Sequence, residues 1–146
     1  SGFNYSITGF NWIGATPTGV LRIFDQAYTG TPNDLASATT GLLATSDPYA
    51  GGQFTFSTAV EVSGGTTLYV YGTGYQATLD PFNGYAGGTA FLASGPTANY
   101  TAQFGDTRFE VFGTASAIPE PSTYAAIAGV MCLGLAWWRR HRAVRV

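Results

Sequence analysis

Apolar and polar residues alternate along much of the first 113 residues. In the stretch FNYSIT (3–8) every second side chain is aromatic or aliphatic, and the same period of two recurs at 53–62, 66–72 and 107–113. This period is typical of β-strands that bury one face. Shorter apolar runs at 19–25 and 89–94 predict further strands.

Turn signals separate these stretches. TGTPND, SDPYAGG and DPFNGYAGG supply the glycines, prolines and Asx residues that chain reversals need. Helical patterning in this part is confined to 33–43, where one short turn of helix is expected. Roughly six to nine short antiparallel strands in one domain are typical of a sandwich or jelly roll. We therefore predict an all-β fold, a jelly-roll-like antiparallel β-sandwich, over 1–113.

The pattern changes after residue 118. From Thr123 to Trp138 the 16 residues carry no charge, and they are apolar on all sides of a helix. Such a helix is about 24 Å long, against about 30 Å for the hydrocarbon core of a bilayer. Pro119 and Pro121 resist extending it backwards, and Ser122 is a good N-cap. We predict one transmembrane helix over about 123–138.

A basic end follows this helix. Trp137 and Trp138 suit the interfacial belt, and Arg139, Arg140 and Arg142 can reach the phosphates. The alternative is a buried helix of a soluble domain, which normally shows a polar stripe, whereas here the charge is collected at one end. Because positive charge stays on the cytoplasmic side, everything before Ser122 is expected to face outward.

The ending PEPSTYAAIAGVMCLGLAWWRRHR (119–142) resembles the PEP-CTERM sorting signal of Gram-negative bacteria. The shared features are a Pro-Glu-Pro motif, an apolar helix and an arginine-rich end, in this order. The resemblance implies that Pro119, Glu120 and Pro121 are the recognised triplet, with Ser122 in the small polar position after it. It also implies a partner, exosortase, a membrane-embedded protease-like enzyme that processes the chain near the motif. The signal would span 119–146, with 139–146 as its cytoplasmic end.

The body resembles the jelly-roll modules called choice-of-anchor domains, which precede interchangeable C-terminal anchors on bacterial surface proteins. The resemblance rests on GVLRIFD, VSGGTTLYVYG, YAGGTAF and DTRFEVFG, and it covers about residues 1–113. Residues 114–118 are then expected to form a short linker to the motif. Six residues, GTASAI, are too few to hold the domain far from the membrane.

Charge separates the two parts. Residues 1–118 carry two arginines against seven acidic residues, a net charge of −5, and 119–146 carry four arginines against Glu120, a net charge of +3. An acidic body without lysine is a poor nucleic-acid binder, so no nucleic-acid partner is expected. The only cysteine, Cys132, lies within the apolar helix, and the body therefore has no disulfide.

The residues for catalysis are mostly missing. The only histidine, His141, follows the membrane helix, which excludes external Ser-His-Asp or Cys-His chemistry and metal sites built on histidine or cysteine. Two carboxylates would suffice for glycoside hydrolysis, but no recognisable pair is present. We predict a protein that is not an enzyme and has no cofactor. Calcium stays open, because oxygen ligands remain at Asp25, Asp34, Asp47, Asp80 and Asp106.

Aromatic residues are the one hint of ligand binding in the body. Rings with a polar tip can stack on a sugar face, which makes Trp12, Tyr69, Tyr71 and Tyr85 candidate glycan-binding residues. The structural alternative is cross-strand pairing of aromatic side chains on a half-exposed sheet.

Two functions follow from these patterns. The first is an exported, non-catalytic surface or extracellular-matrix protein, anchored in the inner membrane, processed by exosortase and linked to exopolysaccharide. The alternative is a carbohydrate-binding module that the same tail delivers to the cell surface. An exported protein is made with an N-terminal signal peptide, and none is recognisable here, so a mature or truncated chain is expected.

Overall fold

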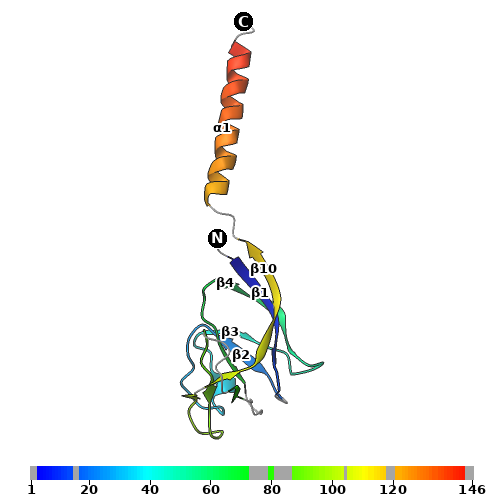
Figure 1. Ribbon diagram of the computed structural model, residues 1–146, viewed down its shortest axis with the longest axis vertical. Helices are drawn as coiled ribbons and strands as arrows, with labels where there is room; N and C mark the ends of the chain where they lie inside the picture. The colour runs from blue at the N-terminus through cyan, green and yellow to red at the C-terminus, as the bar shows by residue number, and fades with distance from the viewer. Residues whose placement is uncertain are drawn as a thin grey trace.

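The computed structural model describes residues 3–14, 17–72, 79–80, 87–103, 105–117 and 121–143. These residues form antiparallel β-sheets followed by one α-helix, α1 (Pro121–Ala143), which extends away from the strands (Figure 1). The prediction of an all-β body is therefore confirmed at this level.

The first sheet has the strand order β10–β1–β4. Its strands are the longest of the body: β1 (Phe3–Trp12), β4 (Phe54–Ser63) and β10 (Phe109–Ala117). The register of β1 shifts between Ile7 and Gly9 against both neighbours. This bulge changes which alternate residues face inward, so that Ile7 is buried before it and Phe10 and Trp12 are buried after it.

The second sheet has the order β3–β2–β5, formed by β3 (Leu42–Thr45), β2 (Leu21–Phe24) and β5 (Tyr69–Gly72). Two further pairs are short: β6 (Leu79–Asp80) with β9 (Asp106–Thr107), and β7 (Phe91–Leu92) with β8 (Thr101–Ala102). The expected turn of helix is present as η1 (Leu35–Ser37), a 3₁₀ helix. The described residues thus form two three-stranded sheets and two short pairs.

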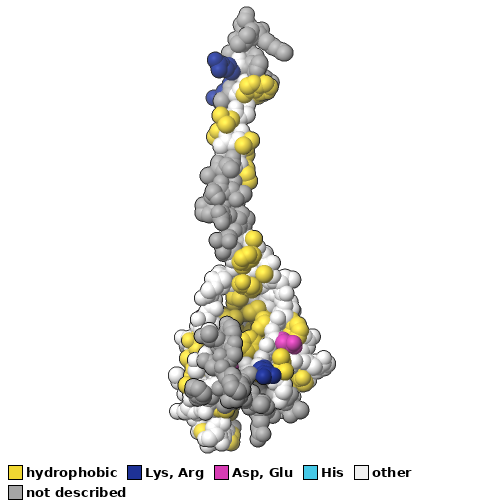
Figure 2. Space-filling view, in the orientation of Figure 1, with side chains coloured by type: hydrophobic (Ala, Val, Ile, Leu, Met, Phe, Trp, Pro, Cys, Tyr) yellow, Lys and Arg dark blue, Asp and Glu magenta, His cyan; other side chains and the backbone are white. Residues whose placement is uncertain are grey.

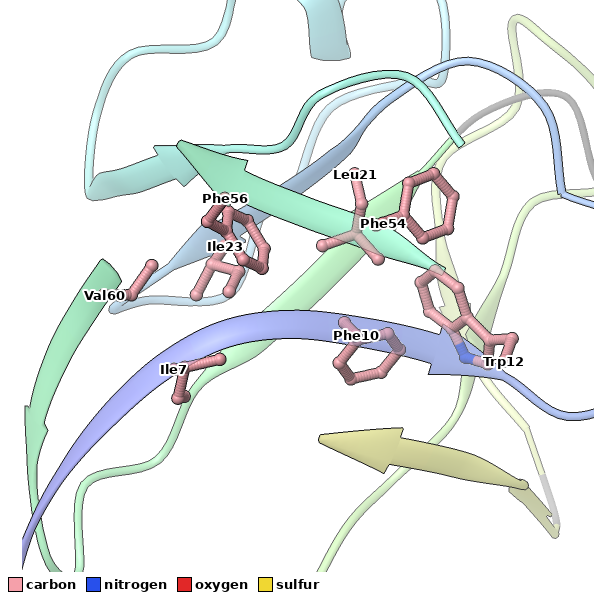
Figure 3. Packing of buried hydrophobic residues seen from close by; sticks show 8 residues of the cluster. All are labelled: Ile7, Phe10, Trp12, Leu21, Ile23, Phe54, Phe56 and Val60. Atoms are coloured by element: carbon pink, nitrogen blue, oxygen red, sulfur yellow. The ribbon is translucent and has the colours of Figure 1, made fainter. Parts of the chain in front are cut away.

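One apolar cluster joins the two sheets (Figure 3). Leu21 and Phe54, which come from different sheets, are both fully buried. The indole of Trp12 packs edge-on against Phe54, with 6.2 Å between ring centroids, and against Phe10, with 4.8 Å. Edge-to-face contacts of this kind add to the free energy of burial. The full cluster is Ile7, Phe10, Trp12, Leu21, Ile23, Phe54, Phe56 and Val60.

The other face of the second sheet is covered as well. Phe24 and Tyr71 on this face pack with Leu35 of η1 into a second cluster. Arg22 fastens the covering segment, because its guanidinium donates to the carbonyl oxygens of Ala36 at 2.7 Å and Ala38 at 3.0 Å. Carbonyls at a helix end carry partial negative charge and attract a cation. The second sheet is therefore buried on both sides, which limits where a ligand can reach it.

The linker predicted over 114–118 is wrong for 114–117. β10 continues to Ala117, which lies opposite Phe3, while Ser116 lies opposite Asn4 and Thr114 opposite Ser6. Small polar and alanine residues gave no strong strand signal, and the unoccupied side of β1 supplies their pairing partner. The sheet therefore runs to within a few residues of the Pro-Glu-Pro motif.

We expect Phe54→Ala to lower the free energy of unfolding by about 3–5 kcal/mol, because it removes a fully buried ring from the cluster between the sheets. The matched control is Thr58→Ala, an exposed residue of the same strand, which is expected to stay within about 0.5 kcal/mol of wild type. Urea unfolding followed by tryptophan fluorescence measures both. Equal effects of the two substitutions would contradict the assignment of this core.

Candidate functional site

The C-terminal helix α1 contains the whole predicted stretch 123–138, so its prediction as a helix is confirmed. The helix begins at Pro121, and proline is favoured at the first helical position, where its missing N–H costs nothing. Ser122 therefore lies inside the helix and not at its N-cap, and the helix begins two residues before the predicted start at Thr123. Pro119 and Glu120 of the motif lie outside the described residues.

Large apolar side chains of α1 are exposed. Leu133 is 73% exposed, Val130 70% and Ile127 55%, values that apolar residues of a packed helix do not show. Trp137 and Trp138 are exposed as well, and Arg139 and Arg140 follow them. Figure 2 shows arginine side chains at the end of the helix that lies away from the β-domain. Along the axis of α1, an apolar segment is thus followed by a basic one.

By length and overall hydropathy, no helix among the described residues suffices to cross a membrane. Arg142 belongs to α1, although its side chain lies outside the described part.

The predicted glycan-binding rings lie mostly in the interior. Trp12 is only 8% exposed, and its indole N–H donates to the hydroxyl of Thr107 at 3.3 Å. Tyr71 is 5% exposed in the second cluster, and Tyr69 is half-buried beside it. Tyr85 lies outside the described residues. Packing between layers leaves little of the Trp12 and Tyr71 rings exposed, yet Trp12, Tyr69 and Tyr71 all line the groove described below, so glycan binding by these residues stays a prediction.

Three tyrosines form a connected group in the second cluster. The ring centroids of Tyr71 and Tyr100 are 5.0 Å apart, and those of Tyr28 and Tyr71 are 5.7 Å apart. The hydroxyl of Tyr100 donates to the carbonyl of Gly72 at 3.1 Å, and that of Tyr71 accepts the backbone N–H of Tyr28 at 3.2 Å. These hydrogen bonds hold the loops onto the second sheet, so the group is structural.

Burial alters the acidity of this group. Burial of the Tyr100 ring, with smaller contributions from the neighbouring Tyr28 and Tyr71, raises the pKa of Tyr100 to about 12. Burial likewise raises the pKa of Tyr71 and of Tyr28. These phenols therefore stay protonated at neutral pH and act as donors or acceptors without charge.

A groove opens along one side of the body, between β10 and β5. It has a volume of about 1420 Å³, and its apolar lining includes Phe109 and Val111 of β10 and Val70 of β5. Val111 lies opposite Phe10, and Phe109 opposite Trp12, so both point to the core side of the sheet. They nevertheless remain 49% and 37% exposed. The period of two over 107–113 predicted a strand here but gave no sign that β10 would be an edge strand.

Acidic residues of the described part serve turns and strand ends. Asp34 accepts the hydroxyl of Thr31 at 2.7 Å, and Asp47 accepts that of Thr55 at 3.2 Å. Within the described ranges, no group of three or more His, Cys, Asp or Glu residues is placed to hold a metal ion. Calcium binding stays a prediction.

Neither family models, curated proteins nor solved structures give a match to this chain.

We expect the free energy of unfolding to fall as pH rises through the window from about 10 to about 12. The unfolded chain loses its tyrosine protons near pH 10, whereas folded Tyr100 keeps its proton until about pH 12. The stabilisation is therefore fully present below pH 10 and is lost above it. Urea midpoints measured from pH 9 upward test this. Tyr100→Phe removes the titrating group and is expected to flatten the slope; an unchanged slope would contradict this role of Tyr100.

Proposed function

We propose that the chain is an exported, non-catalytic surface or matrix protein, anchored in the inner membrane by α1 and processed at Pro119–Glu120–Pro121 by an exosortase. The observation that carries the proposal is the contrast between the two parts. The β-domain buries its own core, and the helix directly after the motif leaves its apolar side chains uncovered.

Membrane insertion would bury these side chains. The uncharged stretch from Thr123 to Trp138 is shorter than a bilayer core, but thinning of the bilayer and the outward reach of arginines can make up several ångströms. Trp137 and Trp138 then fall at the level of the headgroups. Retention of the basic end in the cytoplasm places the β-domain on the periplasmic side.

The motif would be read in the short gap between sheet and helix. β10 ends at Ala117 and α1 begins at Pro121. Insertion of α1 would therefore bring the motif next to the outer surface of the membrane. A residue before proline favours extended backbone, which is the form that proteases bind. Glu120 offers one carboxylate at a fixed height, where a basic pocket can recognise it.

For the body, we propose a structural or adhesive role in an exopolysaccharide layer, carried by a small jelly-roll-like sandwich. Against the alternative of a carbohydrate-binding module, Trp12 and Tyr71 expose little ring surface; in its favour, both residues line the groove between β10 and β5. Binding of the full chain in detergent to a panel of bacterial exopolysaccharides separates the two roles: saturable binding of one glycan favours the module.

We expect Glu120→Ala to block processing while leaving membrane insertion intact. The matched control is Glu110→Ala, which removes an exposed carboxylate from β10 and leaves the motif unchanged. The apparent mass of each variant is compared in the native host and in a host that lacks the sorting enzyme. Equal wild-type masses in the two hosts, or processing of Glu120→Ala at the wild-type rate, would contradict the proposed role of the motif.

We expect replacement of Arg139, Arg140 and Arg142 by serine to disturb orientation before it affects insertion, because these charges hold the C-terminus in the cytoplasm. Protease digestion of intact spheroplasts shows which side the β-domain occupies. If all copies of the triple variant keep the β-domain outside, orientation does not depend on these arginines.

A further inference from the structure

The outer edge of β10 offers backbone groups for pairing. Among the described strands β10 neighbours only β1. The N–H of Gly64 donates to the carbonyl oxygen of Phe3, so the N–H and C=O groups of Phe3 point toward β4. Because these groups alternate in direction along a strand, those of the even-numbered residues next to Phe3 point toward β10. Beyond the bulge, the N–H of Ile13 donates to the carbonyl oxygen of Arg108. Even-numbered residues at this end of β10 therefore also point their backbone groups toward β1. The odd-numbered residues Val111, Gly113, Ala115 and Ala117 therefore direct their backbone groups away from β1.

This edge lacks the usual protection against pairing. Edge strands of soluble proteins are commonly guarded by lysine, proline, inward charges or short length. β10 is nine residues long, contains no proline or lysine, and has Glu110 as its only charged residue. From Val111 to Ala117 it is uncharged. From Val111 to Ala117 a partner strand would thus meet no proline and no charged side chain of β10 itself.

An uncovered apolar strip lies beside the edge. Phe3 and Tyr5 are on the same face of β1 as buried Ile7, yet they are 43% and 42% exposed. Their partners on β10 are Ala117 and Ala115. The first sheet extends beyond the second toward the helix, so nothing in the second sheet covers this end (Figure 1). Figure 2 shows apolar surface continuing from the base of the helix down over the β-domain.

We propose that two copies of the chain pair antiparallel along their β10 strands, centred on Gly113. This register overlaps the whole strand: Val111 lies opposite Ala115 of the second copy, and Phe109 lies opposite Ala117. All outward backbone groups then form ladder hydrogen bonds, and each large side chain meets a small one. The first sheets of the two copies then form one six-stranded sheet, and the core-facing sides of both copies lie on the same face of it.

The same arrangement accounts for the groove and the strip together. In an antiparallel pair the end of β10 nearest the helix in one copy lies beside the end of β10 that borders the groove in the other. Because the core sides match, Phe3 and Tyr5 of one copy approach the open side of the groove that Phe109 and Val111 line in the other. Each copy thus covers the apolar surface that its partner leaves open, and this complementarity favours a second copy as the occupant.

Disulfide cross-linking tests the register in the full chain, held in a mild detergent, with Cys132→Ala as background. Glu110 and Ser116 lie opposite one another across the proposed pair, at a position where Cα atoms are about 4.5 Å apart. Mixing Glu110→Cys chains with Ser116→Cys chains is expected to give a disulfide-linked dimer on mild oxidation. Either population alone should give none, because identical residues are then about 20 Å apart. No dimer in the mixture, or equal dimer in the separate populations, overturns the proposal.

Edge variants test the interface without cysteines. Ala115→Pro removes an outward N–H and is expected to turn the dimer into a monomer by light scattering while the circular dichroism stays that of wild type. Ala115→Lys places a charge at the same position and is expected to do the same. The matched control Thr58→Lys, at an exposed residue of β4, should remain dimeric. If well-folded Ala115→Lys chains keep the wild-type dimer, the interface lies elsewhere.

Discussion

The pairing of β1 on both of its sides is the constraint on which the rest of the structure depends. β1 is the centre of the first sheet, and its bulge between Ile7 and Gly9 directs residues from both halves of the strand into the core. Close approach of the strands at this point explains Gly113, where a Cβ atom would collide with the carbonyl oxygen of Ser6. Without β1 neither β4 nor β10 would have a partner, and the core would lose one wall.

The sheet also determines where the tail begins. Because β10 is hydrogen-bonded to β1 up to Ala117, only residues 118–120 separate the sheet from the start of α1 at Pro121. Any enzyme that acts on the Pro-Glu-Pro motif would meet a folded domain a few residues away. The large apolar side chains described for the helix, by contrast, stand exposed and do not pack on the body.

Period-two patterning predicted the strands well, because alternation reflects which face is buried. The alternating stretches at 3–8, 53–62, 66–72 and 107–113 overlap β1, β4, β5 and β10. It failed where tertiary contacts decide. The bulge in β1 reverses the pattern halfway along the strand, and a bulge leaves no mark in composition.

The candidate site shows the same division. The apolar helix was predictable because a run of uncharged residues is a local property. The fate of Trp12 and Tyr71 was not, since an aromatic residue on a strand reads the same whether a second layer covers it or water does. Residues 114–117 have a low strand propensity, and the sequence could not show that they would pair with β1. Nor could it show that β5 and β10 would border an open groove.

β10 ends three residues before α1 begins, so every copy of the chain has a direction, with the β-domain before the helix and the basic end after it. Helices inserted in one membrane with their basic ends on one side would all run in the same direction. Antiparallel pairing of two β10 strands requires two copies that run in opposite directions. Copies that share a membrane would therefore be held apart by their common direction, however crowded they become, and only a chain cut free of its helix could turn around to join another. On this view the membrane anchor would also prevent pairing of β10 strands, and cleavage would set when and on which side of the membrane assembly starts.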